Sequence, residues 1–250
     1  MAKREIVVPD CFYPGTEYTN NQGSVFLIER YNRAIDIDIK FADGGHRKKV
    51  TAGQIKKGAI QNPFHRVSSG VGYMGHGKFN TMNSPRSSQV WRGILHRCYG
   101  ENRAEKFIKN YEGCTVSDDW HNFQNFAEWY EGNYVEGYEV DKDLLFLGNK
   151  VYSEETCVLV PQWLNVFTAS AKSIRGDCPV GVSERKGKGD FESYCNFEGK
   201  RIHLGVFSSK ESAHKAWMGK KLSIALSKKI EMDLIDKRIY PNVVSIIKNL

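Results

Sequence analysis

Short alternating runs of apolar and polar residues dominate the first quarter of the chain. Residues 24–31 (SVFLIERY) and 34–41 (AIDIDIKF) place apolar side chains at about every second position, the period of a half-buried β-strand. The turn sequence ADGGH follows, and then a third short run, RKKVT. This pattern predicts a small antiparallel β-unit within residues 1–65, with an irregular lead-in at residues 1–23.

The alternation ends in a segment rich in glycine and serine. Residues 66–87 show no periodic apolar positions, and we predict a linker there. The glycine run GYMGHGKF lacks the preceding strand and following helix that a phosphate-binding loop requires. We therefore expect a flexible connector. Basic residues just before it, Arg47 among them, either touch phosphates or are solvated charges at a strand edge.

Apolar residues at helical spacing begin after Ser88, a residue type that commonly caps helices. One face of this predicted helix carries Val90, Trp91, Ile94, Leu95 and Cys98. A second helix is predicted to start near Asp119, with aromatic residues three and four positions apart. We interpret these aromatic residues as core, not as a ligand cage.

The stretch Val140–Asn165 combines two short strands with the start of a helix. Asp141 and Asp143 alternate with their neighbours, so in an extended chain the two carboxylates lie on one face. The pair Gly-Asn predicts a turn, and the apolar run CVLV predicts a strand that ends at Pro161. Proline is common in the first turn of a helix, and that helix would carry Asn165.

The last third of the chain predicts three strands followed by a helix. The strands are expected at residues 180–184, 191–197 and 201–207, separated by glycine-containing turns. Ser208 or Ser209 would cap the helix, and Glu211 would interact favourably with its N-terminal dipole. Apolar residues at helical spacing in the tail are expected to pack back on this body.

The basic and acidic residues are unevenly distributed along the chain, and this distribution indicates the kind of partner. The chain has 36 Lys and Arg against 29 Asp and Glu, a net charge of +7. Residues 172–250 contain 16 of these basic and 9 of these acidic residues, whereas the preceding residues contain 20 of each. The whole excess therefore lies in the last third, which indicates a polyanion partner for that part, or else a solvated basic surface.

An acidic cluster precedes and includes the central stretch. Between Tyr111 and Leu145 nine Asp or Glu residues stand against one lysine. In a protein that binds DNA, such a cluster repels phosphate unless a cation lies between them. The pattern supports a divalent metal site close to Asp141.

Other features exclude several classes of protein. The six cysteines are scattered without a CxxC pair, which rejects a zinc ribbon and a disulfide framework and favours a reducing cytoplasm. No apolar run approaches the length of a membrane span, and the N-terminus has no apolar signal region. We therefore expect a cytoplasmic protein with no membrane partner.

The central order of strand, loop, strand and helix resembles the ββα-metal core of HNH nucleases. In that family a carboxylate and an amide or imidazole hold one divalent metal, and a histidine activates water. The resemblance implies that Asp141 and Asn165 bind the metal, which would be Mg²⁺ or another divalent ion such as Mn²⁺. It also implies that Asn149 or Thr156 braces the loop.

Lys142 occupies the position of the family's general-base histidine. A lysine is ordinarily protonated at neutral pH and cannot take a proton from water. Either Lys142 loses its proton through desolvation, or Asp143, His96 or His121 is the base. Alternatively the module only binds DNA, and Lys142 contacts phosphate. The residues proposed for catalysis are Lys142, Asp143, Asn149 and His96.

The C-terminal strands and helix resemble the AP2/ERF DNA-binding domain. The resemblance rests on Gly181-Val182, Phe191, Leu204-Gly205-Val206-Phe207, Ala213 and Ala216. It implies that the sheet face opposite the helix enters the major groove of duplex DNA, where Arg185 and Arg201 would contact guanine and Asn196 adenine. The DNA-binding residues proposed on or beside this face are Ser183, Arg185, Lys186, Lys188, Tyr194, Asn196, Arg201 and His203.

Together these predictions describe an α+β chain. Residues 1–65 would form the N-terminal β-unit, 66–87 a linker, 88–171 an HNH-like core with flanking helices, and 172–250 an AP2-like domain with a helical tail. This order resembles bacteriophage-encoded HNH homing endonucleases, which act in the infected bacterial cell. We expect metal-dependent hydrolysis or nicking of double-stranded DNA. The alternatives are a catalytically inactive DNA-binding regulator and, more distantly, an interaction protein that uses neither site.

Overall fold

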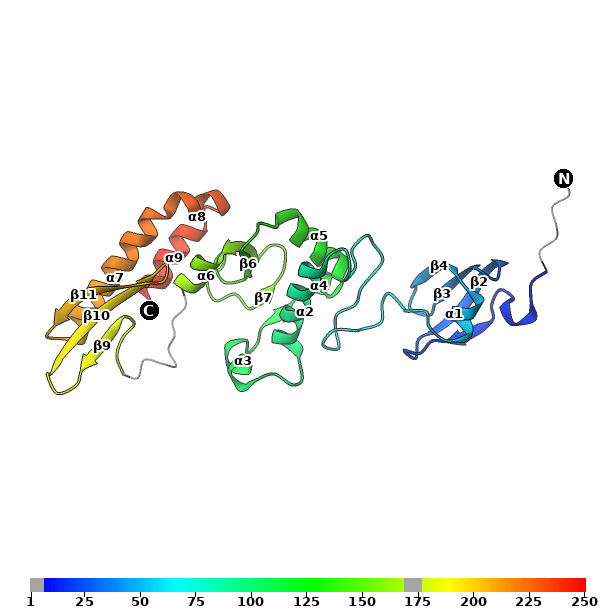
Figure 1. The fold of residues 1–250 in the computed structure, drawn as a ribbon, viewed down its shortest axis with the longest axis horizontal. Coiled ribbons are helices and arrows are strands. Elements are labelled where there is room, and N and C mark those ends of the chain that lie inside the picture. The colour runs from blue at the N-terminus through cyan, green and yellow to red at the C-terminus, as the bar shows by residue number, and fades with distance from the viewer. Residues whose placement is uncertain (1–6, 169–176) are drawn as a thin grey trace. The chain divides into compact units, whose positions relative to one another are not determined.

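The computed structural model describes residues 7–168 and 177–250, which form a mixed α+β structure as predicted (Figure 1). The chain divides into two compact units, Met1–Gly132 and Asn133–Leu250. This division falls inside the segment 88–171 that was predicted to be one core. The predicted domain boundary between residues 171 and 172 lies outside the described residues.

The first unit begins with an antiparallel sheet, four-stranded in the described residues. Its strands, in spatial order, are β1 (Glu17–Thr19), β2 (Val25–Arg33), β3 (Asp36–Phe41) and β4 (His46–Val50). Strands β2, β3 and β4 confirm the predicted alternation. The predicted irregular lead-in was wrong at β1, which pairs with the start of β2. A 3₁₀ turn (Asp10–Phe12) precedes the sheet and α1 (Ala52–Lys56) follows it.

Alternate side chains of β2 and β3 build the core of this sheet. Phe26, Ile28 and Ile39 are fully buried, together with other apolar residues of the same cluster. Asp38 is also buried, and the Arg30 guanidinium lies 2.6 Å from its carboxylate. The pKa of Asp38 is lowered because hydrogen bonds from Arg30 and the Lys49 backbone outweigh the effect of burial.

The glycine-rich segment after the sheet is held in place by Gln124. The Gln124 side chain accepts the Phe79 N–H at 3.0 Å and donates to the carbonyl groups of Met74 and Phe79. Helix α2 (Pro85–Tyr99) begins within the range predicted as a linker, with Ser84 at its N-cap and a proline in its first turn. The prediction that Ser88 caps this helix was wrong by four residues, and Ser88 is buried inside the helix.

The remaining elements of the first unit pack aromatic residues together. They are α3 (Glu105–Asn110), β5 (Thr115–Val116), α4 (Asp118–His121) and α5 (Phe123–Asn133). Trp91 and Trp120 are buried, and the Trp91 indole N–H donates to the Trp120 carbonyl at 2.7 Å. The predicted aromatic core is confirmed. The predicted second helix is interrupted at Asn122, whose backbone is extended and bridges to Tyr73.

The second unit opens with a pair of antiparallel strands and a short helix. Strand β6 (Tyr138–Asp141) pairs with β8 (Val158–Pro161), and α6 (Gln162–Phe167) follows β8 directly. The connection contains β7 (Val151–Tyr152). Leu144, Val160 and Leu164 join one buried core with residues of the C-terminal helices. The order strand, loop, strand, helix is thus present.

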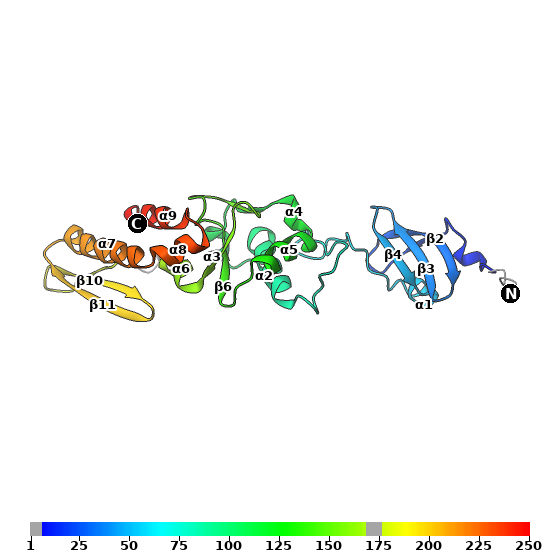
Figure 2. The same ribbon diagram turned by 90° about the horizontal axis from the view of Figure 1, so that it is seen from above.

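A sheet with the order β11-β10-β9 follows, and it is antiparallel and three-stranded in the described chain. Its strands are β9 (Val182–Arg185), β10 (Asp190–Phe197) and β11 (Lys200–Phe207). Helix α7 (Lys210–Ser227) covers one face, as Figures 1 and 2 show, and begins at the capping residue Ser209. Three strands with one helix were predicted here, and this arrangement is confirmed.

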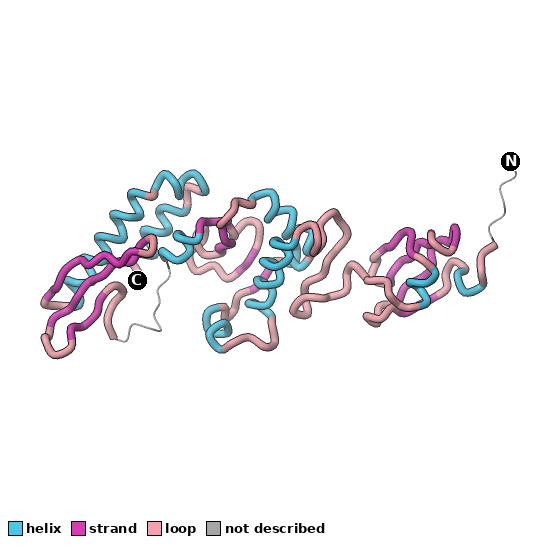
Figure 3. Tube along the Cα trace, in the orientation of Figure 1, coloured by secondary structure: helices cyan, strands magenta, loops and turns pink. Residues whose placement is uncertain are grey.

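The C-terminal tail consists of α8 (Lys229–Ile235) and α9 (Ile239–Lys248), visible at the end of the tube in Figure 3. Ile239, Val243 and Ile247 of α9 are fully buried in the core that also contains Trp217 of α7. The prediction that these tail residues pack back on the body is confirmed.

Gly181 and Gly205, in and beside the C-terminal sheet, have backbone conformations that favour glycine. Gly181 has φ +78, and a Cβ there would lie 2.0 Å from Trp217 Cδ1, so no side chain fits between strand β9 and helix α7. Gly205 has φ +127 and lies where the pairing of β10 with β11 shifts register.

Candidate functional site

Asp141 lies at the end of β6 and organises the loop that follows. Its Oδ1 accepts the backbone N–H groups of Asp143 and Leu144, at 2.7 and 2.8 Å. Its Oδ2 has no hydrogen-bond partner among the described residues. Burial raises the pKa of Asp141, and the neighbouring Asp143 adds to this effect, while the two backbone N–H groups oppose it. One oxygen is therefore structural and the other is available to a ligand.

Lys142, at the position predicted for a general base, is paired with its neighbour. Its ammonium lies 2.7 and 2.8 Å from the two oxygens of Asp143, and it also donates to the Asn149 carbonyl at 3.3 Å. Lys142 is buried, whereas the Asp143 side chain is 51% exposed. An ammonium held in this way has no lone pair for a proton from water, so this geometry does not favour Lys142 as the base.

Asn149 ties the loop together. Its amide donates to the carbonyl groups of Lys142 and Val151, at 2.8 and 2.7 Å, and accepts the Val151 N–H. The Thr156 hydroxyl donates to the same Val151 carbonyl. Both side chains that the resemblance assigns to bracing the loop therefore make bracing contacts. The Asn149 side chain is engaged with the backbone and makes no hydrogen bond with a carboxylate of the described residues.

Asn165 forms a hydrogen bond with Glu139 of β6, a residue that the predicted motif did not include. Its amide donates to the Glu139 carboxylate at 2.7 Å, joining α6 to β6. Glu139 and Asp141 are two positions apart on the same strand, so they lie on one face. That alternation was visible in the sequence and was the signal that could have identified Glu139.

These oxygen atoms are suited to a hard cation. The described residues contain no group of three or more His, Cys, Asp or Glu that could hold a metal. Glu139, Asp141 and Asn165 nevertheless offer two carboxylates and one amide. Mg²⁺ and Mn²⁺ prefer such oxygen donors, and Mg²⁺ is commonly held by one or two carboxylates plus water. These donors are of the chemical kind that the implied metal takes.

The two histidines named as possible bases lie in the first unit. His96 is exposed near the end of α2. His121 is mostly buried, 3.6 Å from the Asp118 carboxylate, and burial lowers its pKa. Its Nε2 is buried and has no hydrogen-bond partner among the described residues. The catalytic role of either histidine stays a prediction.

The residues predicted to contact DNA share the exposed face of the C-terminal sheet. In β10, Ser193 and Cys195 are buried towards α7, and the alternating Tyr194 and Asn196 lie on the other face. The register places His203 opposite Tyr194 and Arg201 opposite Asn196. Ser183 and Arg185 lie opposite Glu192 and Asp190 on β10, and Lys186 and Lys188 lie in the exposed β9–β10 turn.

Two carboxylates on this face, Asp190 and Glu192, were not identified from the sequence. Arg185 lies 3.0 Å from the Asp190 carboxylate and 3.4 Å from the Glu192 carboxylate. The Tyr194 hydroxyl also donates to Glu192, at 2.9 Å. The Arg185 guanidinium is thus engaged by two carboxylates. The strand register, which brings these residues opposite one another, was not available from the sequence.

Arg201 is held differently. Its guanidinium carbon lies 3.8 Å from the centre of the Tyr194 ring, and the His203 ring lies 5.0 Å from the same ring. No carboxylate forms an ion pair with Arg201 in the described part of the chain. A guanidinium that packs on an aromatic ring makes a cation–π contact and still has N–H donors for other acceptors.

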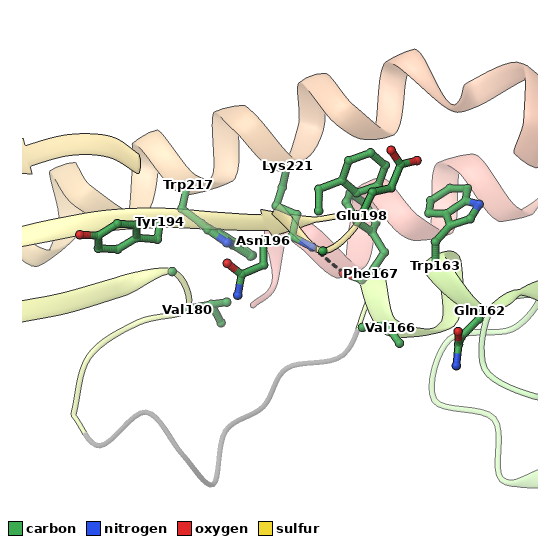
Figure 4. A pocket seen from close by; sticks show the side chains of 13 residues that line it. Gln162, Trp163, Val166, Phe167, Val180, Tyr194, Asn196, Glu198, Trp217 and Lys221 are labelled. Carbon is green, nitrogen blue, oxygen red and sulfur yellow. Dashed lines mark hydrogen bonds between the residues drawn. The ribbon is translucent and has the colours of Figure 1, made fainter. Parts of the chain in front are cut away.

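Beside this sheet lies a cavity of about 590 Å³ with aromatic walls (Figure 4). Trp163 and Phe167 of α6 and Trp217 of α7 line it, together with Lys221. Lys221 donates to the Phe167 carbonyl at 2.9 Å, and its Nζ lies 3.7 Å from the centre of the Phe167 ring. Burial lowers the pKa of Lys221 to about 8. No sequence motif pointed to this lysine.

A scan against protein-family models found no match, and searches of curated proteins and of solved structures found none either. Within the described residues, no helix is both long and apolar enough to cross a membrane. The function therefore has to be argued from the geometry of the residues.

Proposed function

We propose that this protein is a metal-dependent DNA endonuclease with an HNH-like hairpin–helix and an AP2-like DNA-binding sheet. The observation that carries the proposal is the 2.7 Å hydrogen bond between Asn165 and Glu139. It holds the helix residue that the resemblance assigns to the metal beside the strand that ends in Asp141. The predicted ligands thus belong to one hairpin–helix module.

In this proposal Asp141 binds the cation through Oδ2, while Oδ1 keeps the loop folded. Asn165 and Glu139 complete the protein's oxygen donors. A bound divalent ion supplies stabilisation of the charge that develops on the phosphate and on the leaving oxygen. The exposed sheet face, with Arg201, His203 and the lysines of the β9–β10 turn, holds the DNA backbone and base edges.

One observation favours a second candidate, a DNA-binding protein without nuclease activity. Lys142 stands where the family has its base, and its ammonium is paired with both oxygens of Asp143. This arrangement leaves the hairpin–helix without a base of its own at that position. In this alternative the same surfaces bind DNA, and Lys142 has a structural role.

The two candidates separate in a plasmid-nicking assay with Mg²⁺ or Mn²⁺. The variant Asp141→Asn keeps an oxygen for the N–H groups of Asp143 and Leu144, so the loop should fold, but it weakens the cation ligand. We expect its nicking rate to fall about 100-fold or more, by analogy with the loss of one group that stabilises transition-state charge. Glu155→Gln, an exposed carboxylate of the same connection, is the matched control and should nick like the wild type.

Equal nicking by the wild type and Asp141→Asn would contradict the nuclease proposal. Absence of nicking by a wild-type protein that binds the plasmid would select the inactive DNA-binding protein. A direct titration of the wild type with Mn²⁺, followed by paramagnetic relaxation of water protons, tests the metal site without activity. The relaxation change should weaken in Asp141→Asn and persist in Glu155→Gln.

A further inference from the structure

A second cavity, of about 510 Å³, lies in the first unit. Its wall combines Arg47 from β4, the glycine-rich segment at residues 74–81, Arg92 from α2 and Gln124 from α5. Apart from Arg47, which the sequence predicted either to touch phosphate or to be a solvated charge, the predicted function uses none of these residues. The glycine run was predicted to be a flexible connector without the context of a phosphate-binding loop, yet it forms part of a concave surface.

The charged side chains that line this cavity are positive. Two arginines line it, and none of its described lining residues is an Asp or Glu. Arg92 is exposed and makes no hydrogen bond or ion pair with a described residue. The Arg47 Nε donates to the Gln61 carbonyl at 3.1 Å, which fixes the guanidinium and leaves its two terminal nitrogens for another acceptor. Burial lowers the pKa of Arg47, as expected for a cation that lacks a counter-charge.

The glycines hold the backbone close to α4 and α5. A Cβ at Gly75 would lie 2.1 Å from the Asn122 Oδ1, and one at Gly77 would lie 2.1 Å from the Gln124 Oε1. A side chain at either glycine would therefore displace the amide that it meets. Along the segment, the backbone N–H groups of His76 and Gly77 have no acceptor in the described chain. Successive free N–H groups next to cations are a common feature of anion sites.

His76 adds a neutral donor. Its Nε2 accepts the His46 backbone N–H at 3.1 Å, so in the neutral ring the proton is on Nδ1. Burial lowers the pKa of His76, and the positive charge of Arg47 lowers it further. The ring is therefore neutral at neutral pH and does not add to the repulsion between the cations.

We propose that this cavity binds a phosphate group through the guanidinium groups of Arg47 and Arg92. Arginine matches the spacing of phosphate oxygens with two parallel N–H donors. The phosphate belongs either to a DNA backbone or to a free nucleotide, since the cavity is large enough for a nucleotide. The DNA source rests on the proposed function, whereas the phosphate site itself does not.

The primary test titrates the full-length protein with inorganic phosphate at constant ionic strength, with NMR or calorimetry as the readout. We expect saturable binding that weakens at least tenfold in Arg92→Gln. Arg33→Gln changes an exposed arginine of β2 outside the cavity and should bind phosphate like the wild type. Arg47→Gln gives a second, independent loss, checked by circular dichroism for an unchanged fold. Equal phosphate binding by wild type and both cavity variants would overturn the proposal, and so would the absence of saturable binding by the wild type.

Two further arms identify the source of the phosphate. If the site takes a DNA phosphate, Arg92→Gln should lower the slope of log affinity against log salt by about 0.9 for a short duplex. If the site takes a nucleotide, a nucleoside monophosphate should bind more tightly than inorganic phosphate, and the salt slope for duplex should not change. Arginine-dependent phosphate binding by a protein that neither binds nor nicks DNA would reject the proposed nuclease function and leave this site standing.

Discussion

Lys142 and Lys221 are equally buried, but Lys142 has a carboxylate as its nearest partner, whereas Lys221 has a carbonyl group and an aromatic ring. Each is 8% exposed. The Lys142 ammonium is 2.7 and 2.8 Å from the two oxygens of Asp143. Lys221 instead has the Phe167 carbonyl at 2.9 Å and the Phe167 ring, and it forms no ion pair with a described carboxylate. Burial accordingly lowers the pKa of Lys221 to about 8.

The two equally buried lysines differ in their nearest partners. A carboxylate returns much of the electrostatic stabilisation that desolvation removes, and Lys221 has no such partner among the described residues, so burial lowers its pKa. Loss of the Lys142 proton through desolvation was one of the alternatives that the sequence left open. In the structure both lysines are buried. Lys221 lies against an aromatic cavity, whereas Lys142 has the Asp143 carboxylate one residue away.

The largest expected effect concerns the pH dependence of stability. The pKa of Lys221 is about 8 when folded, against an ordinary 10.5. Below pH 8 both states are protonated and the folded state pays the full cost of the buried charge. As pH rises from about 8 to about 10.5, the folded state loses its proton first, so stability should increase by about 3 kcal/mol. Lys221→Met should remove this increase.

Urea denaturation of the wild type and Lys221→Met at several pH values from 7.5 to 10.5, followed by a probe in the second unit, measures the difference in unfolding free energy. Lys215→Met, an exposed lysine on the same helix, is the control and should keep the wild-type dependence. The same pH dependence of stability in Lys221→Met and Lys215→Met would show that burial of Lys221 does not cause the increase.

The loop around Lys142 allows the next test. Asn149→Ala removes two hydrogen bonds to the Lys142 and Val151 carbonyl groups and one from the Val151 N–H. We expect the free energy of unfolding to fall by about 2–3 kcal/mol, at roughly 1 kcal/mol for each bond. Asn196→Ala removes an exposed amide with no hydrogen-bond partner among the described residues, and it should change stability by less than about 0.5 kcal/mol. Equal losses in chemical denaturation would show that the loop is not held by Asn149.

Parts of this structure follow from the sequence, for identifiable reasons. Strands β2 to β4 and β9 to β11 were predicted because burial on one face appears as alternation along the chain. Strand β1 was missed because three residues are too few to show a period. Lys221 was missed because its environment is made by Phe167, 54 positions away. The Asn165–Glu139 pair spans 26 positions, so only half of it could be proposed from the motif.

The same contrast recurs between two arginines on the sheet face, where the smallest effects are expected. Arg185 is engaged by Asp190 and Glu192, whereas Arg201 lies on the Tyr194 ring without an acidic partner in the described chain. If this face binds DNA as proposed, Arg201→Ala should weaken specific binding by about 1–3 kcal/mol. Arg185→Ala should cost less than about 1 kcal/mol, because binding a base would require its guanidinium to leave two carboxylates.

Fluorescence anisotropy with a specific duplex and a scrambled duplex, at two salt concentrations, separates base contacts from phosphate contacts. The decisive control is Glu192→Gln, which removes one acid from Arg185 and keeps its size. If the carboxylates restrain Arg185, this variant should bind DNA more tightly than the wild type, and Arg185→Ala should then cost more in its background. A larger loss from Arg185→Ala than from Arg201→Ala in the wild type would show that the ion pairs position Arg185 for DNA and do not withhold it.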